Sequence, residues 1–315
     1  MGREIRDVCA ESSPAIALTL VGATEEETGL LTELEGEPAV VGRLDAFHLA
    51  GAGVALLAGT PQGSRKAVEL AGDTALIDVT YANEDHPRAR LRAPMAEPPG
   101  YRAPAGAIHV IAHPAAIALA LVLNRMQGGA PIRRSVAHVF EPASERGRDG
   151  VDELQQQTVS IFSFKNQPRA VFDTQLAFNL LARYGDEAPQ ALADFELRIE
   201  RHLATLLAHG CGAPLPSLRL IQAPVFHAYS ISLWVELENN PGTAALEAIL
   251  AGGPIDLRTA DLAPPDNVGA AGQSGVMVGA IAVDRNAPGA VWVWVVADNL
   301  RLMAENAVLV AKELL

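Results

Sequence analysis

Two kinds of strand pattern follow one another along this chain, and together they restrict the fold to an α/β protein with two different sheets. Before residue 131, short apolar runs such as GVALLAG and TALIDVTYA alternate with stretches of helical spacing such as SRKAVELA. Strands that alternate with helices predict parallel βαβ units in a doubly wound sheet. From Pro131 onward the strands SVAHVFEP, YSISLWVEL and AVWVWVVA are longer and largely alternating, which favours a mixed sheet with one covered face.

The order of these patterns predicts four segments. We expect a polar tail over residues 1–13, a nucleotide-type doubly wound domain over 14–116, a mixed-sheet α+β domain over 117–297, and a helix over 298–315 that returns to the first domain. Within them, PAIALTLVG predicts a strand. EEETGLLTELEG predicts a helix with Gly36 as its cap, and TQLAFNLLARYG predicts another helix.

Composition excludes several classes of function. The 315 residues carry a net charge of −13, which disfavours nucleic acid and anionic membrane as partners, because phosphate groups require a basic face. The longest apolar run, residues 115–123, is too short to span a bilayer. Only two cysteines, Cys9 and Cys211, are present, which fits a reducing, cytoplasmic location.

Ordered landmarks along nearly the whole chain resemble the aspartate-semialdehyde dehydrogenase family. They are VGAT, LIDVTYA, IHVIAHPAAIALALVL, DELQQQT, QLAFNLLARYG, QAPVFHAYS and VVADNLR. The resemblance is closest to catalytically degenerate paralogues with the QAPVF variant. It implies a Rossmann-like doubly wound domain plus a mixed-sheet α+β dimerisation domain, assembled as a homodimer.

The same resemblance implies that the catalytic positions have changed. In active members a Cys thiolate attacks the aldehyde, hydride passes to NADP, and phosphate releases an acyl phosphate. The nucleophile position here is Ala116, whose methyl group cannot react. The position of the acid/base histidine is Tyr229, a poor base at neutral pH. His227 lies two residues earlier and is either a displaced base or a surface or packed histidine.

The positions that hold substrate anions in the family have changed as well. Gln222 stands where relatives have an Arg that binds the substrate carboxylate. Its neutral side chain cannot donate the two charge-assisted hydrogen bonds that an arginine makes to a carboxylate. Glu141 occupies the position of the active-site Gln and would repel a carboxylate or a phosphate unless it were paired. Arg146 is a candidate partner for Glu141; the alternative is that both are solvated loop charges.

The cofactor turn is the last departure from the family pattern. Relatives read GATGxVG, whereas this chain reads GATEEETG, which keeps Gly22, Ala23 and Thr24 as remnants. A pyrophosphate site needs glycines so that backbone N–H groups can approach the ligand. The carboxylates at residues 25–27 would instead accept hydrogen bonds from these N–H groups, in place of a bound ligand. We therefore expect no cofactor, the family's NADP binding being lost.

Other candidate sites are weaker. Cys211 in HGCGAP is a nucleophile only if a base lies nearby, and a loop thiol is the alternative. The consecutive acids and histidine of NEDHPR are metal-ligand types, but neighbours in sequence rarely converge on one ion, so no metal is expected.

Coordinated change at the nucleophile, base, substrate and cofactor positions favours a non-catalytic paralogue with a structural or regulatory role. It would be a homodimer, or a heterodimer with an active relative. Two alternatives remain. One is an NADP-dependent semialdehyde dehydrogenase or another enzyme with altered chemistry in the same cleft. The other is a small-molecule binding module.

Overall fold

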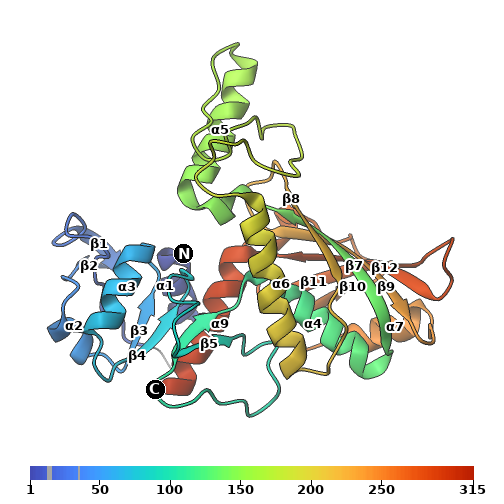
Figure 1. The fold of residues 1–315 in the computed structure, drawn as a ribbon, viewed down its shortest axis with the longest axis horizontal. Coiled ribbons are helices and arrows are strands. Elements are labelled where there is room, and N and C mark those ends of the chain that lie inside the picture. Colours follow the sequence, from blue (N-terminus) through green and yellow to red (C-terminus); the bar gives the residue numbers. More distant parts are fainter. Residues whose placement is uncertain (13–15, 35) are drawn as a thin grey trace. The chain divides into compact units, whose positions relative to one another are not determined.

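The computed structural model describes residues 1–12, 16–34 and 36–315 of the chain (Figure 1). These residues form two compact units, one made of Met1–Ala112 with Met303–Leu315 and the other of His113–Leu302. Each unit is built around its own large sheet. In the described ranges, none of the helices is long and apolar enough to cross a membrane.

A four-stranded parallel sheet forms the centre of the first unit, in the order β3-β4-β6-β5. The strands are β3 (Val54–Leu57), β4 (Ala75–Asp78), β5 (Ala89–Arg92) and β6 (Ile108–Ile111). Helix α3 (Pro61–Leu70) connects β3 to β4 and begins at Thr60, whose Oγ1 accepts a hydrogen bond from the Gly63 N–H at 3.1 Å. A polar cap followed by proline favours a helix start. The parallel α/β sheet predicted from sequence is confirmed.

The polar tail predicted over residues 1–13 is wrong for most of its length. Residues Gly2–Glu11 form helix α1. Ile5, Val8 and Cys9 follow i, i+3, i+4 spacing and are buried on one face of this helix. The charged residues between them made the segment resemble a solvated tail. The prediction for residue 13 lies outside the described residues.

The helix predicted over EEETGLLTELEG is also wrong. This region forms a turn followed by a hairpin, in which β1 (Leu31–Leu34) pairs antiparallel with β2 (Glu37–Val40). Gly36, predicted as a helix cap, has a φ of +83° between the two strands. Leu31 is 78% exposed, so its side chain supplies no packing that would hold a short helix on the core.

The strand predicted from PAIALTLVG is much shorter in the structure. Among its described residues only Val21 pairs, in a parallel bridge with Gly42, and residues 14 and 15 lie outside the described ranges. Helix α2 (Ala46–Ala50) follows the hairpin. It begins at Asp45, whose carboxylate accepts a hydrogen bond from the His48 N–H at 2.9 Å.

A six-stranded mixed sheet forms the second unit, in the order β10-β11-β12-β9-β7-β8. The pairs β7–β9, β9–β12 and β11–β12 are antiparallel, whereas β7–β8 and β10–β11 are parallel. The strands are β7 (Ile132–Glu141), β8 (Ser217–Gln222), β9 (Tyr229–Leu237), β10 (Ile255–Arg258), β11 (Val276–Val283) and β12 (Ala290–Ala297). This is the mixed sheet that the long alternating strands predict.

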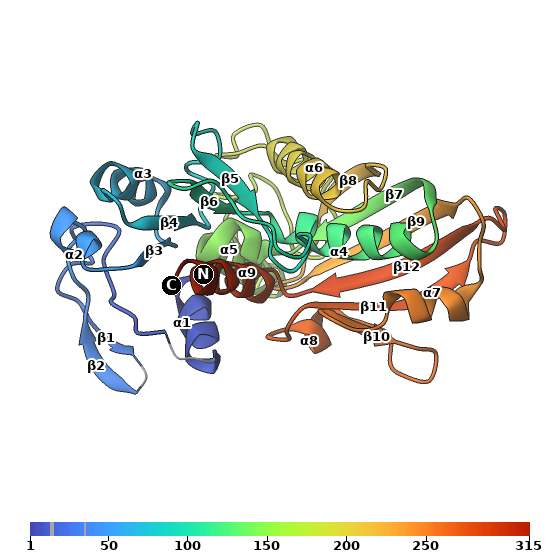
Figure 2. The same ribbon diagram turned by 90° about the horizontal axis from the view of Figure 1, so that it is seen from below.

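Helices that contact the strands of this sheet are α4 (Pro114–Gly129), α6 (Leu192–His209), α7 (Thr243–Leu250) and α8 (Asn267–Ala270). The unit also contains η1 (Ala143–Arg146) and α5 (Gly147–Phe162), which contact each other. In β12, Val291 and Val293 are at most 2% exposed, while Trp292 between them is 38% exposed. Helices α4 and α6 pack against each other and contact strands β12 and β8 (Figure 2).

The helix predicted from TQLAFNLLARYG is absent, and the segment is an extended loop. The side-chain oxygen of Gln157 accepts hydrogen bonds from the Leu176 and Ala177 N–H groups, at 2.7 and 3.0 Å. The Gln157 amide nitrogen donates to the Pro168 and Thr174 carbonyls, both at 2.9 Å. These bonds pair backbone groups of the loop that would otherwise bond within a helix. They therefore stabilise the loop over the helix that the leucine spacing predicts.

The C-terminal helix α9 (Asn299–Leu314) returns to the first unit from residue 303 onward, as the sequence predicts. Its Glu313 carboxylate accepts a hydrogen bond at 2.6 Å from Arg92, which is only 1% exposed. Glu97 accepts a second one from Arg92 at 2.9 Å. The carboxylates of Glu97 and Glu313 compensate the cost of burying Arg92, so this cluster joins α9 to β5.

Candidate functional site

The first candidate position, Ala116, lies in the first turn of α4 and is fully buried. The helix begins at His113, whose Nδ1 accepts a hydrogen bond from the Ala115 N–H at 3.3 Å. The His113 backbone N–H donates to His202 Nδ1 on α6 at 3.0 Å. Burial places the pKa of His113 well below its ordinary value, with neighbouring cationic groups adding to the effect. The imidazole is therefore neutral at physiological pH.

Tyr229 is the first residue of β9 and is also fully buried. Its hydroxyl donates a hydrogen bond to Glu141 Oε2 at 3.2 Å. Its ring meets the His113 ring edge-on, with 5.8 Å between the centroids. The structure thus brings the end of β7, the start of β9 and the start of α4 together.

Glu141 forms the centre of a buried polar cluster. Its carboxylate makes an ion pair with Arg146, and both side chains are less than 10% exposed. The proposal that Arg146 pairs with Glu141 is confirmed, and the alternative of solvated loop charges is wrong. Burial lowers the pKa of Arg146, but Glu141 and Tyr184 outweigh burial and raise the pKa above its ordinary value. The guanidinium also lies over the Phe195 ring, 3.2 Å from its centroid.

Gln222 completes this cluster from the end of β8. Its amide nitrogen donates to the Glu141 backbone carbonyl at 2.8 Å. The Tyr184 hydroxyl lies 2.6 Å from Gln222 Oε1 and 3.3 Å from Glu141 Oε1. Burial and the Glu141 charge together raise the pKa of Tyr184. The polar atoms of Gln222 are thus bonded to the chain itself.

Glu145 forms a second buried group beside the first. Asn299 Nδ2 donates to Glu145 Oε1 at 2.8 Å, and Asn299 Oδ1 accepts from the Ala228 N–H at 3.2 Å. His113 Nε2 lies 3.6 Å from Glu145 Oε2. Burial, reinforced by the Glu141 charge, raises the pKa of Glu145 to about 7. Glu145 is therefore the acidic group in this cluster that titrates near neutral pH.

The retained turn Gly22-Ala23-Thr24 lies in the first unit and binds one of the chain's own acids. Glu27 Oε2 accepts hydrogen bonds from the Ala23 N–H at 2.7 Å and the Thr24 N–H at 3.2 Å. Residues 25–29 form turns here, so Glu27 caps a turn and not the helix that the sequence suggested. Beside it lies a pocket of about 320 Å³, whose lining includes Gly22, Arg43, Thr60 and Lys66.

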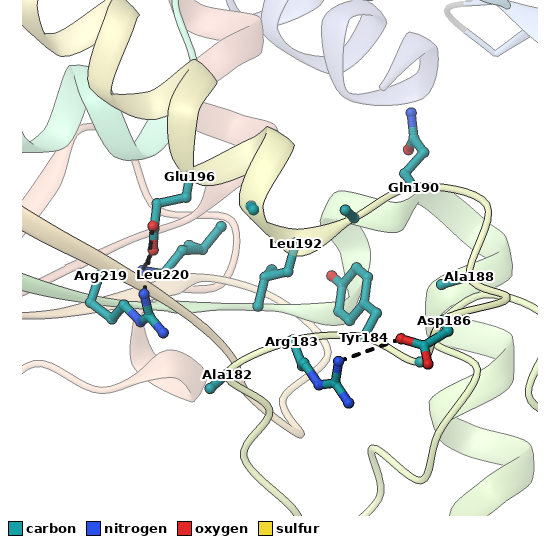
Figure 3. Close-up of a pocket in the computed structure, with 13 residues that line it drawn as sticks. Ala182, Arg183, Tyr184, Asp186, Ala188, Gln190, Leu192, Glu196, Arg219 and Leu220 are labelled. Atoms are coloured by element: carbon teal, nitrogen blue, oxygen red, sulfur yellow. Dashed lines mark hydrogen bonds and ion pairs between the residues drawn. The ribbon is translucent and has the colours of Figure 1, made fainter.

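A larger pocket, of about 360 Å³, lies in the second unit between the 182–191 loop, α6 and β8 (Figure 3). Its charged groups are paired, Arg183 with Asp186 at 3.4 Å and Arg219 with Glu196 at 3.9 Å. Tyr184 lines this pocket while its hydroxyl reaches the Glu141 cluster. This pocket is not predictable from the sequence, because the first residues of its 182–191 loop belong to TQLAFNLLARYG, whose spacing predicts a helix.

The weaker candidates do not join either site. His227 is exposed in the turn before β9 and therefore does not share a strand with Tyr229. Cys211 is an exposed thiol in the loop after α6. The NEDHPR segment forms turns, and no group of three or more His, Cys, Asp or Glu in the described part of the chain is placed to hold a metal ion.

Three residues of the cluster escaped the sequence analysis, namely Tyr184, His202 and Asn299. Each is at most 5% exposed. The sequence signal that could have revealed such residues is a polar residue at a position where the helical spacing predicts a buried apolar one. His202, for example, follows Ile199 and precedes Leu203 and Leu206 on the buried face of α6.

Comparisons with known proteins agree with this architecture. The family model described as "Semialdehyde dehydrogenase, dimerisation domain" matches residues 127–302, more than half of the chain. An aspartate-semialdehyde dehydrogenase of Rickettsia bellii is 32% identical over 213 residues, which cover 66% of this chain and 62% of that relative. A Pseudomonas aeruginosa protein named "USG-1 protein homolog" is 30% identical over 281 residues, covering 87% of this chain and 82% of the relative.

A solved structure supports the same assignment. The structure of a probable aspartate-semialdehyde dehydrogenase from Pseudomonas aeruginosa has a TM-score of 0.86 at 26% identity, covering 99% of this chain and 94% of that one. The fold and the matched region define a semialdehyde dehydrogenase scaffold. The chain belongs to the aspartate-semialdehyde dehydrogenase family, whose relatives here carry both the dehydrogenase and the USG-1 names.

Proposed function

We propose that this chain is a non-catalytic, dimeric member of the family, with a structural or regulatory role. The observation that carries the proposal is the buried cluster around Glu141. At the family's catalytic positions, the polar groups of Glu141, Tyr229 and Gln222 bond to one another or to Arg146 and Tyr184. A substrate would have to displace these bonds in order to bind.

The missing nucleophile supports this proposal most directly. The family's reaction requires a thiolate that forms a thioester, and Ala116 has only a methyl group. Loss of the nucleophile in a well-studied hydrolase costs on the order of 10⁶ in rate. Tyr229 does not replace the base, because its hydroxyl donates to Glu141 and its reference pKa is about 10.

The group that binds the substrate carboxylate in the family has also been replaced. The family's arginine is replaced by Gln222, whose amide nitrogen donates to the Glu141 and Ala223 carbonyls. Arg146 is neutralised by the Glu141 carboxylate. In effect, Glu141 takes the place that a substrate carboxylate would need beside Arg146.

The cofactor turn supports a parallel loss of NADP. The N–H groups of Ala23 and Thr24, which a pyrophosphate would need, are bonded to Glu27. A carboxylate that faces a phosphate at ~6 Å and an effective dielectric of ~20 costs roughly 2–3 kcal/mol before screening. That cost alone weakens binding by about 50-fold. We therefore propose that NADP binding is lost.

Isothermal titration calorimetry with NADP tests this proposal. We expect no binding tighter than about 1 mM on the unmodified protein. Replacing Glu27 by glycine should free the two N–H groups. Asp152→Asn serves as a matched control, because it removes a carboxylate that is 46% exposed and lies on the second unit. Micromolar affinity with Glu27 in place would overturn the proposed loss of the cofactor.

A second candidate is an enzyme with altered chemistry in the same cleft. The observation that favours it is Glu145, a buried carboxyl with a pKa near 7, placed 3.6 Å from the neutral His113. A general acid–base group works best when its pKa lies near the operating pH. A turnover screen of carbonyl compounds, with Glu145→Gln as the control, distinguishes the two: activity that depends on Glu145 would favour this candidate.

A third candidate is a binding module without turnover, favoured by the pocket of about 360 Å³ beside Tyr184. Its volume suits a small ligand. A thermal-shift panel of small carboxylates and nucleotides tests it, with Leu192→Trp as the variant that fills the pocket. A stabilising compound that loses its effect in that variant would support the module.

We propose that the dimer forms through the second unit, since residues 127–302 match a dimerisation domain. A homodimer is the primary expectation, and a heterodimer with an active relative is the alternative. Sedimentation of the purified chain distinguishes them, because only the homodimer forms in the absence of the relative.

A further inference from the structure

The pocket of about 360 Å³ in the second unit carries an arginine–acid pair at each of its two ends. Arg219 faces Glu196 at one end, and Arg183 faces Asp186 at the other (Figure 3). Leu192 lies between the two pairs (Figure 3). A pocket of this volume is large enough for a small ligand. The charges of the two pairs balance, so a ligand that matches them has charges of both signs.

The two pairs differ in how much water surrounds them. The side chains of Arg183 and Asp186 are 82% and 85% exposed, so their attraction is screened and contributes little. The Glu196 side chain is only 23% exposed, although Arg219 beside it is 60% exposed. A charged ligand group therefore gains more at the Glu196 end, because less water competes with it there.

A backbone hydrogen bond holds the Glu196 carboxylate at that end. Its Oε2 accepts a hydrogen bond at 2.6 Å from the N–H of Leu220 on β8, the edge strand of the sheet. Its Oε1 lies 3.9 Å from Arg219 Nη1, which is too long for a hydrogen bond. A fixed acceptor and a guanidinium with five donors thus face each other across a short gap.

We propose that this end of the pocket binds the head group of a free α-amino acid, with the ligand's ammonium on Glu196 and its carboxylate on Arg219. The two charged groups of such a molecule are attached to the same carbon atom, so they can bridge an acid and an arginine that lie this close together. Two charge-assisted contacts then replace one long ion pair. A dicarboxylate would instead add two negative charges to a chain whose net charge is already −13.

The rest of the pocket favours an aliphatic side chain on this ligand. Four alanines line it together with Leu192, and they are Ala182, Ala188, Ala191 and Ala193. The Tyr184 ring forms another wall, and the Tyr184 hydroxyl lies 2.6 Å from Gln222 Oε1. Because this hydrogen bond fixes the ring, the wall is in place before a ligand arrives, which lowers the cost of binding.

The inference rests on the third candidate function, a binding module without turnover, and names the ligand of that module. None of the described residues that line the pocket is one of the four family positions Ala116, Glu141, Gln222 and Tyr229. Binding here therefore does not depend on the groups that carry the family's chemistry.

Isothermal titration calorimetry of the full chain with L-leucine tests the inference. Two further ligands have the same carbon skeleton but lack one charge of the head group: L-leucinamide lacks the carboxylate, and 4-methylpentanoate lacks the ammonium. We expect L-leucine to bind with a dissociation constant below about 1 mM. Each of the other two should bind roughly 10-fold more weakly or worse, because it loses one charge-assisted contact.

Two variants test the assigned side chains. Glu196→Gln keeps an oxygen for the Leu220 N–H but removes the charge, and Arg219→Gln removes the cation. Each should weaken L-leucine binding by roughly 10-fold or more. Arg148→Gln is the matched control, because Arg148 is 90% exposed and pairs with Asp152 on α5, away from the pocket lining. A thermal melt of each variant checks that it is folded.

The result that overturns the inference can be told apart from the failure of the binding module. Equal affinity for L-leucine and 4-methylpentanoate, or L-leucine binding that survives both pocket variants, overturns the inference. A nucleotide or dicarboxylate that binds and is blocked by Leu192→Trp, with no binding of L-leucine, also overturns it but leaves the module intact. If none of these compounds binds, the inference and the module both fail.

Discussion

Replacing Arg146 by methionine should leave Glu141 as a buried carboxylate without a cationic partner in direct contact. Methionine keeps an apolar stem over Phe195, so the substitution removes mainly the charge. Glu141 is fully buried, and its carboxylate also accepts hydrogen bonds from the hydroxyls of Tyr184 and Tyr229, at 3.3 and 3.2 Å. Breaking a buried pair in this way costs about 3–5 kcal/mol. For a unit of this size the unfolding midpoint should fall by roughly 6–20 °C.

Differential scanning calorimetry and urea unfolding of four proteins measure this effect: the wild type, Arg146→Met, Glu141→Gln and the double variant. The double variant should be less destabilised than the sum of the two single changes, by about 1–3 kcal/mol, because the unpaired carboxylate is gone. A matched control is Arg148→Met, which removes a 90% exposed arginine on α5. An Arg146→Met protein within about 0.5 kcal/mol of the wild type would refute the reasoning, since ordinary surface substitutions have effects of that size.

The remaining predictions concern the same cluster and the proposed absence of catalysis. Because the folded-state pKa of Glu145 is raised from 4.5 to about 7, the native state binds more protons than the unfolded state between these values, and stability should fall as pH rises through this window. The loss is about 3 kcal/mol, and Glu145→Gln should abolish that slope in pH-dependent urea unfolding; an unchanged slope would exclude Glu145 as its source. Ala116→Cys combined with Tyr229→His should restore no semialdehyde oxidation, because Glu141 would still pair with Arg146 and Glu27 would still bind the Ala23 and Thr24 N–H groups. Activity in this double variant, measured as NADPH absorbance, would contradict the proposed loss of substrate and cofactor binding.

The sequence correctly predicted the helices and strands whose buried apolar residues recur at a regular spacing. The alternating valines of β12 and the unbroken apolar run of α4 indicated buried elements of the correct type. Both patterns arise from local periodicity, which the burial of one face imposes directly. The sheet class of each unit and the return of the terminal helix followed from the same reasoning.

The sequence failed where a distant polar side chain decides the local conformation. The loop around Leu176 has leucines at helical spacing, yet Gln157 on α5 satisfies its backbone and holds it extended. Leu31 had helical spacing as well, but its exposure shows that no core was available to a helix there. Nothing local reveals which backbone groups a remote amide will bond.

Some residues of the candidate site were likewise predictable from the sequence, and others were not. The positions of Glu141, Gln222 and Tyr229 came from landmarks in family order, and the structure places all three in one hydrogen-bonded cluster. The buried ion pair with Arg146 was one of two alternatives, because sequence does not reveal whether a loop charge is solvated. Asn299 was missed because it joins the cluster from an element 155 residues beyond Ser144.

The most direct test of the central claim is the initial rate of phosphate-dependent NADPH formation from aspartate semialdehyde by the unmodified protein. An active member of the family, assayed at the same concentration, is the positive control, and its cysteine-to-alanine variant sets the background. The account predicts a rate equal to that background, because Ala116 cannot form the thioester. A rate above the background that grows with protein concentration and requires phosphate would contradict it.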